Sequence, residues 1–317
     1  MKQRSHTDRF AVLDTLADRL GTDVINGRLD IPEQFGSGYC MGYVFNEHIR
    51  MMILNYELKE DIVVKNTRVN KPSRRILFKF QNLPVRDEIA KGIKAIPSVL
   101  IATSSMNSDA VIPVHTNKGM INIDVDVEYL NALFDTSAHS PVLQGLLKND
   151  QPLLFEQMIY PSLQQVVDEI MNDEVTETFT MFYHRVKAEE LVCRLLMELE
   201  QRDERKLYAL NSADIEAIYK VRERILEHMD EPPVIGELSA TVNMSPSKLK
   251  QLFRQIFGDS IFSYYQGFRM REAARLLKED GLTVGDAGYR LGFSNLSHFA
   301  RVFERHMGSK PKQYSKG

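Results

Sequence analysis

The pattern of hydrophobic and polar positions differs between the first third of the chain and the remainder. The first third carries short runs of β-branched, aromatic and other apolar residues, broken by Asn, Gly, Pro or charged clusters, and such runs predict strands. One helix is predicted at 8–20, and the predicted strands follow at 38–45, 49–58, 61–69, 74–83, 98–106 and 119–127. Because no helical segment separates them, these strands favour an antiparallel sandwich or barrel over a parallel sheet.

From about Val127 the apolar residues recur with helical periodicity. Short helices are predicted at 127–135, 141–148 and 161–172, and a long helix at 177–202. Seven apolar residues fall roughly on one face of the long helix: Phe179, Phe182, Val186, Leu191, Leu195, Leu196 and Leu199. Two interpretations stay open for this stripe, because it can pack against the strand domain or form a dimer interface.

A stretch that is first charged and then polar, residues 201–212, predicts a linker between two domains. After it, Ser212 is suited to cap a helix over 213–229, which Pro232 and Pro233 end. The expected architecture is therefore α+β. A cupin-like or sandwich domain spans 1–200, with strands at about 36–126 and helices at about 127–200, and an all-α domain spans 213–317.

The all-α part of the sequence contains an internal duplication. The first matching positions lie 49 residues apart: Leu238-Ser239 with Ala287-Gly288, Val242-Asn243 with Leu291-Gly292, and Ser245 with Ser294. The later ones lie 50 apart: Leu249 with Phe299, Phe253 with Phe303, and Gly258 with Gly308. The second copy thus has one extra residue directly after its serine.

Each copy predicts a helix, a tight turn and a second helix that a glycine ends. The turn holds Asn243 or Gly292, residue types that accept a positive φ. Ser245 or Ser294 is then predicted to cap the second helix. This spacing is typical of a helix-turn-helix, whose second helix enters the major groove of DNA.

The solvent-facing positions of the two second helices are mainly basic or hydrogen-bonding. They are Ser247, Lys248, Lys250, Gln251 and Arg254 in the first copy, and Asn295, Ser297, His298, Arg301 and Arg305 in the second. Arg pairs bidentately with guanine and Gln or Asn with adenine, whereas Lys and Ser suit phosphates. An ordinary solvated face is the alternative, but two basic, capped copies favour DNA binding.

The charge distribution points in the same direction. The formal net charge of the chain is −3, yet residues 1–231 hold 27 Lys and Arg against 36 Asp and Glu, and residues 232–317 hold 13 against 7. A basic block on an acidic remainder indicates an acidic partner for that block, and nucleic acid is the leading candidate.

Composition and motifs exclude several other classes of protein. The chain is 43% hydrophobic and 26% charged, which is typical of a soluble globular protein. No apolar run approaches the ~18–20 residues of a membrane span, and the N-terminus lacks the apolar segment of a secretion signal. We therefore expect a cytoplasmic protein without a membrane partner.

Neither a metal site nor an enzyme is expected. Cys40 and Cys193 are isolated, which excludes a four-cysteine zinc site or a disulfide framework. The N-terminal histidines, His6, His48, His115, His139 and His184, stand singly. No nucleophile-elbow, phosphate-loop or dinucleotide motif is present. We therefore expect no cofactor and no catalytic residue.

The run AARLLKEDGLTVGDAGYRLGFSNLSHFARVFERHMGSKPKQY resembles the signature of the AraC/XylS family of bacterial transcription regulators. The matching features are its GF turn, its SHF–RVF helix and its G-x-x-P ending, and the resemblance covers about 213–315. It implies base-reading positions at Ser247, Lys250, Gln251, Ser297, His298 and Arg301. The sequence departs from the family at Ser239 and Gly288, where alanine is common, and at Ala287, where isoleucine is expected.

The resemblance also implies how the domains divide the work. Residues 213–317 would form a double helix-turn-helix DNA-binding domain, and residues 1–200 a ligand-sensing and dimerisation domain. The implied partners are double-stranded promoter DNA, a small-molecule effector, RNA polymerase and a second copy of the chain. The helical order at 160–202 resembles family members that control siderophore-uptake genes. The alternative is a regulator of the same kind without a small-molecule ligand, controlled by expression level or a protein partner.

Two groups of residues in the strand region are candidates for contacting a ligand. Apolar and aromatic residues line a cavity or, more simply, form the core: Tyr39, Tyr43, Phe45, Met51, Met52, Tyr56, Phe78 and Phe80. Lys71, Arg74, Arg75 and Lys79 form a basic cluster that suits an anionic ligand, although a solvated loop and strand edge is the favoured interpretation. The sequence leaves the ligand-binding residues unknown.

Overall fold

The computed structural model describes residues 11–64, 74–83, 97–104, 112–134, 140–172, 174–202 and 206–316. The chain divides into two compact units, Met1–Leu210 and Asn211–Gly317, and each is described by itself.

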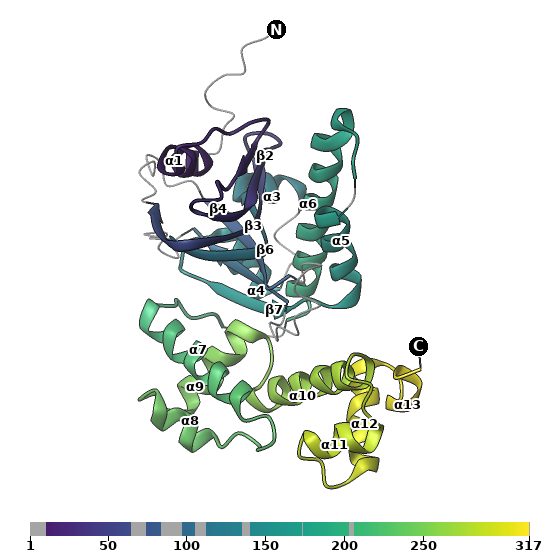
Figure 1. Cartoon of the computed structure of the whole chain (residues 1–317). Coiled ribbons are helices and arrows are strands. Elements are labelled where there is room, and N and C mark those ends of the chain that lie inside the picture. The colour runs from purple at the N-terminus through teal and green to yellow at the C-terminus, as the bar shows by residue number, and fades with distance from the viewer. Residues whose placement is uncertain are drawn as a thin grey trace. The chain divides into compact units, whose positions relative to one another are not determined.

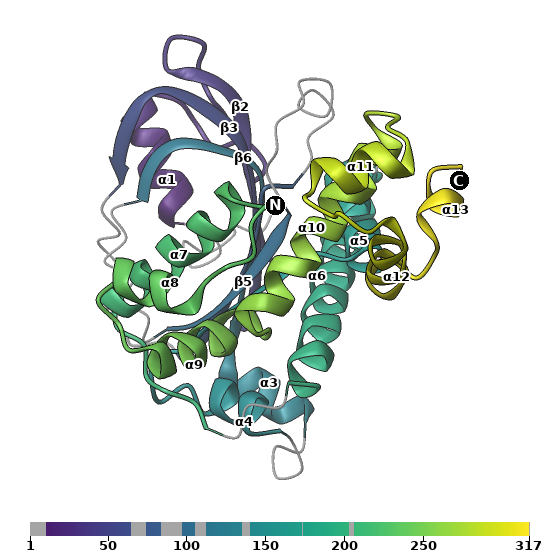
Figure 2. The same ribbon diagram turned by 90° about the horizontal axis from the view of Figure 1, so that it is seen from below.

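The N-terminal unit is built on a seven-stranded sheet in which all neighbouring strands are antiparallel (Figure 1). In spatial order the strands are β1 (Arg28–Asp30), β2 (Gly36–Val44), β3 (Ile49–Val64), β6 (Ile112–Asp126), β4 (Arg75–Gln81), β5 (Ser98–Thr103) and β7 (Leu154–Met158). Figure 2 shows the long strands β3 and β6 curving together. The expectation of a β-rich N-terminal region is confirmed.

The strands differ from the sequence prediction in several places, and the three-residue strand β1 was not predicted. The predicted strands 49–58 and 61–69 are one strand, β3, up to Val64, and the rest of the second lies outside the described residues. Strand β6 begins at Ile112 rather than at 119. Strand β7 was not predicted, because five residues carry too little periodicity and β7 is defined by its pairing with β5.

Five helices accompany the sheet among the described residues of this unit. They are α1 (Ala11–Leu20), α3 (Val127–Leu133), α4 (Pro141–Lys148), α5 (Pro161–Asn172) and α6 (Glu177–Glu200). Asp126 and Ser140 cap α3 and α4, since their side chains accept backbone N–H groups of the first turn. Helices α4 and α5 have the bounds that were predicted, 141–148 and 161–172.

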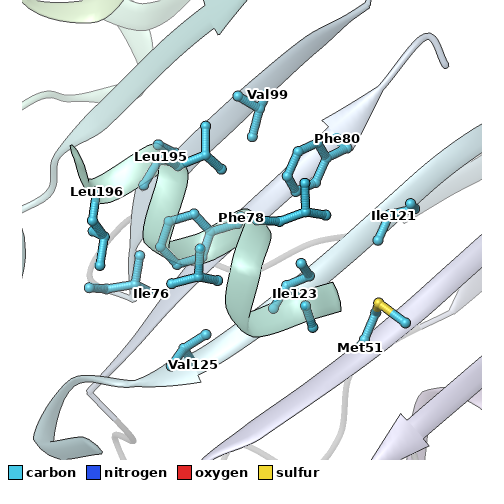
Figure 3. Close-up of a cluster of buried hydrophobic side chains, with 14 of the residues drawn as sticks. Met51, Ile76, Phe78, Phe80, Val99, Ile121, Ile123, Val125, Leu195 and Leu196 are labelled. Atoms are coloured by element: carbon cyan, nitrogen blue, oxygen red, sulfur yellow. The ribbon is translucent and has the colours of Figure 1, made fainter. Parts of the chain in front are cut away.

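Side chains of the strands alternate between two apolar cores. Ile121, Ile123 and Val125 of β6 lie with Phe78 and Phe80 of β4 in a core that helices α3 to α6 cover. Figure 3 shows Leu195 and Leu196 of α6 among these strand residues. On the other face, Met52, Leu54 and Met120 pack against Leu13, Leu16, Ala17 and Leu20 of α1.

The residues proposed to line a cavity are parts of these cores. Tyr43, Met51, Phe78 and Phe80 are buried in the first core, and Tyr39 and Phe45 pack against it. Met52 and Tyr56 are buried in the second core. The structure therefore supports the simpler of the two interpretations for all eight.

The apolar stripe predicted on α6 is divided between two faces of the helix. Leu191, Leu195, Leu196 and Leu199 are buried together with His184, Ala188 and Val192. In contrast, Phe179, Phe182 and Val186 are 62%, 69% and 44% exposed. Their spacing of three and four residues forms a separate row on the outer side. The seven residues therefore do not share one face, as the sequence pattern had indicated.

The C-terminal unit contains seven helices among the described residues. They are α7 (Ser212–Glu227), α8 (Ile235–Thr241), α9 (Pro246–Phe257), α10 (Ile261–Lys278), α11 (Val284–Arg290), α12 (Leu296–Met307) and α13 (Pro311–Tyr314). Helix α10 runs from the group α7–α9 to the group α11–α13 (Figures 1 and 2). Asn211, not Ser212, caps α7, because its side chain accepts the N–H of Asp214.

The internal duplication of the sequence is a duplication of structure. Helices α8 and α11 begin 49 residues apart, and helices α9 and α12 begin 50 apart. The two turns place Asn243 at φ 51° and Gly292 at φ 74°. The expected all-α double helix-turn-helix domain is therefore confirmed.

Candidate nucleic-acid interface

Helix α9 is the second helix of the first helix-turn-helix. Ser245 caps it as predicted, since its Oγ accepts the N–H of Lys248 at 3.3 Å, and Pro246 occupies the first turn. Gly258, at φ 76°, ends the helix. Both ends of α9 are thus fixed by local sequence.

Packing fixes which face of α9 points outward. Leu249, Leu252, Phe253 and Ile256 are buried, as the sequence predicts. Phe253 contacts the ring of Tyr264 on α10 edge to face, with 5.4 Å between centroids. The opposite face of the helix is exposed.

Helix α12 has the same construction with a different cap. The predicted cap was Ser294, but Asn295 caps the helix, because its Oδ1 accepts the N–H of His298 at 3.0 Å. The extra residue of the second copy is inserted at this point, so the cap moves by one position. Phe299 and Phe303 are buried beneath α12, and Gly308, at φ 73°, ends it.

All ten predicted DNA-contacting residues are exposed. Ser247, Lys248, Lys250, Gln251 and Arg254 lie on the outer face of α9, and Ser297, His298, Arg301 and Arg305 lie on that of α12, with Asn295 directly before it. Glu304 is the only acidic residue in the two helices. Each helix therefore presents mainly cationic and hydrogen-bonding groups to the solvent.

One of these cations is paired inside the domain. The Lys248 Nζ lies 2.7 Å from Oδ1 of Asp214, in the first turn of α7, and the Asp214 side chain is only 14% exposed. Sequence reasoning missed this pair, because 34 residues separate the two groups and no periodicity links them. A phosphate that approaches Lys248 would therefore also meet a carboxylate.

The basic cluster of the N-terminal unit is only partly available for a ligand. Arg74 donates to the carbonyl of Lys148, and Arg75 pairs with Asp124 at 3.1 Å and donates to the carbonyl of His48. Lys79 is half-buried in β4, and its burial lowers its pKa. Lys71 lies outside the described residues. The two arginines thus hold the sheet and its neighbours together.

His184 of α6 is a buried polar residue of the N-terminal unit. Its ring stacks on that of Tyr43, with 4.3 Å between centroids, and its Nδ1 lies 2.8 Å from the carbonyl oxygen of Thr180. Burial lowers the pKa of His184. Within the described ranges, no three His, Cys, Asp or Glu side chains are grouped so as to hold a metal ion. The helices in those ranges include none with the length and apolarity to span a membrane.

The comparisons with known proteins agree on the C-terminal unit. A family model described as a helix-turn-helix domain matches residues 238–317. Regulatory protein PchR of Pseudomonas aeruginosa is 36% identical over 75 residues, which are 24% of this chain and 25% of that protein. The arabinose operon regulatory protein of Escherichia coli is 32% identical over 83 residues, 26% of this chain and 28% of that protein.

A third relative aligns over a longer region. The HTH-type transcriptional regulator MtrA of Neisseria gonorrhoeae is 25% identical over 195 residues, which are 61% of this chain and 64% of that protein. The chain thus spans between a quarter and just under two thirds of the length of these three relatives.

Solved structures similar to this chain include a DNA-binding domain and a probable transcriptional regulator. The DNA-binding domain of AdpA in complex with a target DNA is 27% identical and covers 32% of this chain and 90% of its own, with a TM-score of 0.30. A probable AraC family transcriptional regulator from Rhodopseudomonas palustris is 30% identical and covers 32% and 95%, also with a TM-score of 0.30.

Proposed function

Because the C-terminal domain is a helix-turn-helix domain of the AraC type, we propose that this protein is a sequence-specific DNA-binding transcription regulator. Helices α9 and α12 would enter two successive segments of the major groove, about one helical turn or ~34 Å apart. Since one chain carries both helices, its site need not be palindromic. Because bacterial promoter DNA lies in the cytoplasm, such a regulator would act there. The proposal includes no enzymatic activity.

One observation carries this proposal: two capped helices of a duplicated unit each turn a basic, hydrogen-bonding face to the solvent. An ordinary solvated face would mix acidic and basic residues, whereas only Glu304 is acidic here. Arg301 and Gln251 supply the side-chain types that read guanine and adenine, and Lys248 and Arg254 supply charge for phosphates.

The direct test is capture of fragmented genomic DNA by the purified protein, followed by sequencing. We expect enrichment upstream of a coherent set of genes, and loss of that enrichment in an Arg301→Ala, Gln251→Ala double variant. Equal enrichment of all fragments by both proteins would contradict sequence-specific recognition. The captured genes would also test the resemblance to regulators of siderophore uptake, which stays a prediction.

For the N-terminal unit we propose control of DNA binding by a small-molecule effector. The support is the family resemblance and the MtrA alignment, which is longer than the C-terminal unit. A ligand would act only through a difference in affinity between DNA-competent and incompetent states. The alternative is control by expression level or a protein partner, and it predicts that no metabolite changes DNA affinity. Contact with RNA polymerase would follow if bound protein activates transcription.

A second copy of the chain is the partner that we propose for the outer face of α6. Phe179, Phe182, Val186, Cys193 and Met197 lie on this face at helical spacing and are exposed, and we call them the outer stripe. Ion pairs between residues four apart, Arg185–Glu189 and Arg194–Glu190, accompany the stripe. An apolar row with charges beside it is the pattern of a helix that packs against a like helix.

A further inference from the structure

Helix α10 carries a buried cation at its middle. Arg269 is only 5% exposed. On its N-terminal side, Tyr264 contacts Phe253 of α9. On its C-terminal side, Met270 and Ala273 belong to the core of the second helix-turn-helix. Arg269 therefore lies between the part of α10 that packs on the first helix-turn-helix and the part that packs on the second.

The guanidinium of Arg269 holds the turn of the second helix-turn-helix. Its Nη2 donates to the carbonyl of Leu291. Its central carbon lies 4.0 Å from the ring centroid of Phe293 and 4.9 Å from that of Tyr265. A planar guanidinium fixes both the direction of its hydrogen bond and the plane of its stacking, which an aliphatic side chain of equal size would not do.

The same turn also contacts the segment that follows α7. A Cβ atom on Gly292 would lie 2.5 Å from the carbonyl oxygen of Asp230, so the two backbones touch. The Tyr265 hydroxyl donates to the carbonyl of Met229 at 3.1 Å. Asp230, Tyr265, Arg269, Gly292 and Phe293 together form what we call the clamp.

We propose that Arg269 is a positioning residue that fixes the angle between α9 and α12, and so sets the spacing between DNA segments that the protein accepts. This inference rests on the proposed function. Apolar packing along α10 is non-directional and tolerates rotation. The clamp, in contrast, joins the segment after α7, helix α10 and the turn of the second helix-turn-helix through directional contacts. One inserted base pair rotates the second DNA segment by about 35°, and a rigid pair of helices would not follow it.

The first test needs no DNA. Spin labels are placed at Lys250→Cys on α9 and Glu304→Cys on α12 in the full chain, with Cys193→Ser to remove the exposed thiol. Labelled chains are diluted with unlabelled protein, so that only distances within one chain are measured. We expect one narrow distance distribution, and at least a doubling of its width when Arg269→Met is added. Phe293→Leu, which removes the stacked ring, should broaden it as well.

The second test measures DNA spacing with the same full chain. For the unmodified protein, insertion of one base pair between the two contacted segments should weaken binding by more than about tenfold. Arg269→Met should bind the original site and the lengthened site with affinities that differ by only about twofold, because its two helices can then move independently. Lys248→Ala is the control, since loss of a phosphate contact weakens binding to both sites alike and leaves their ratio unchanged.

The outcomes separate this inference from the proposed function. A distance distribution that stays narrow in both clamp variants would overturn the inference, whatever the DNA measurements give. A broadened distribution with an unchanged spacing ratio would overturn it too. Broadening of the distribution without specific DNA binding by the unmodified chain would support the positioning of the helices and contradict the proposed function. If Arg269→Met does not fold, the distance distribution and the spacing ratio of Phe293→Leu test the inference in its place.

Discussion

The ten exposed residues that are predicted to contact DNA differ in the contacts that they make inside the domain. Lys248 pairs with Asp214, and the Oδ1 of Asn295 accepts the N–H of His298. Arg301 and Gln251 are exposed on outer faces between the capped end and the glycine of each helix. We therefore propose that Arg301 and Gln251 read bases and that Lys248 contacts a phosphate, whereas Asn295 caps α12.

Arg301→Ala and Lys248→Ala should weaken DNA binding in different ways. Loss of Arg301 should cost about 1–3 kcal/mol and relax specificity at one base pair, because a bidentate contact to a base edge is lost. Loss of Lys248 should weaken binding to all sequences and flatten the dependence on salt. Titrations with single-base variants of the site at several salt concentrations measure both. Identical effects of the two changes on every sequence would contradict this division.

Asp214→Asn should strengthen DNA binding without changing specificity. The carboxylate lies 2.7 Å from the Lys248 ammonium, so its removal leaves that charge to a phosphate. We expect a gain of at most about 1 kcal/mol, as for other partly exposed pairs, and the same gain on specific and random DNA. The double variant with Lys248→Ala is the control, since it should lose most of the gain. Weaker binding by Asp214→Asn would show that the carboxylate orients the lysine.

The cap of α12 gives a prediction about stability. Asn295→Ala should lower the free energy of unfolding by about 0.5–2 kcal/mol, because the N–H of His298 loses its acceptor. Ser294→Ala is the matched control, as its side chain caps nothing in the structure, and it should change stability by less than about 0.5 kcal/mol. Denaturant titrations of both variants give the comparison. A larger loss in Ser294→Ala would restore the cap predicted from the sequence.

At the scale of the elements, helix α6 has one side buried in a core and one side exposed. Its inner side, with Leu195, Leu196 and Leu199, belongs to the N-terminal core. Its outer stripe begins with Phe179 and Phe182, and these two rings are the most exposed large aromatic side chains of the helix. A sequence pattern that counts apolar residues at helical spacing merges these sides, because their positions interleave along the chain.

The outer stripe predicts a dimer that a single change on α6 disrupts. Phe182→Ser should shift sedimentation toward the monomer, because a large apolar side chain leaves the proposed interface. Met181→Ser is the matched control: Met181 is 45% exposed but lies off the stripe. Both variants should unfold at nearly the same denaturant concentration as the unmodified chain. Equal sedimentation of all three proteins at every concentration would rule out this interface.

At the scale of the molecule, the two units differ in the residues that form their cores and in the balance of basic and acidic residues. The cores of the N-terminal unit lie within residues 13–199, and the core around α10 to α12 lies within residues 270–303. The positive balance of the sequence falls in the part that contains α9 and α12. We therefore expect each unit to fold by itself and DNA binding to be confined to the second.

A fragment of residues 211–317 should fold alone and bind the same DNA sequences as the full chain. We expect weaker binding, because one copy lacks the avidity of the proposed dimer, and no response to any effector that changes binding by the full chain. Anisotropy titrations with labelled sites measure both. A fragment that is folded but selects different sequences would show that the N-terminal unit contributes to recognition.

The sequence by itself determined many helices, turns and strands of this protein, because each of these depends mainly on residues that are close together in the chain. Capping residues, positive-φ turn residues and helical periodicity predicted the double helix-turn-helix and which face of α9 is buried. Short runs of β-branched, aromatic and other apolar residues predicted most of the strands. The resemblance of 213–315 to one family added the expected partner. These features need no information about distant parts of the chain.

Only the tertiary structure decided the features that join distant residues. It showed the pairing of β7 with β5, the division of α6 into two sides, the ion pair of Lys248 with Asp214 and the clamp around Arg269. The physical reason is the same in each case. Hydrogen bonds, ion pairs and burial depend on which segments meet in space, and the period of a sequence reports the face of an element but not its neighbour.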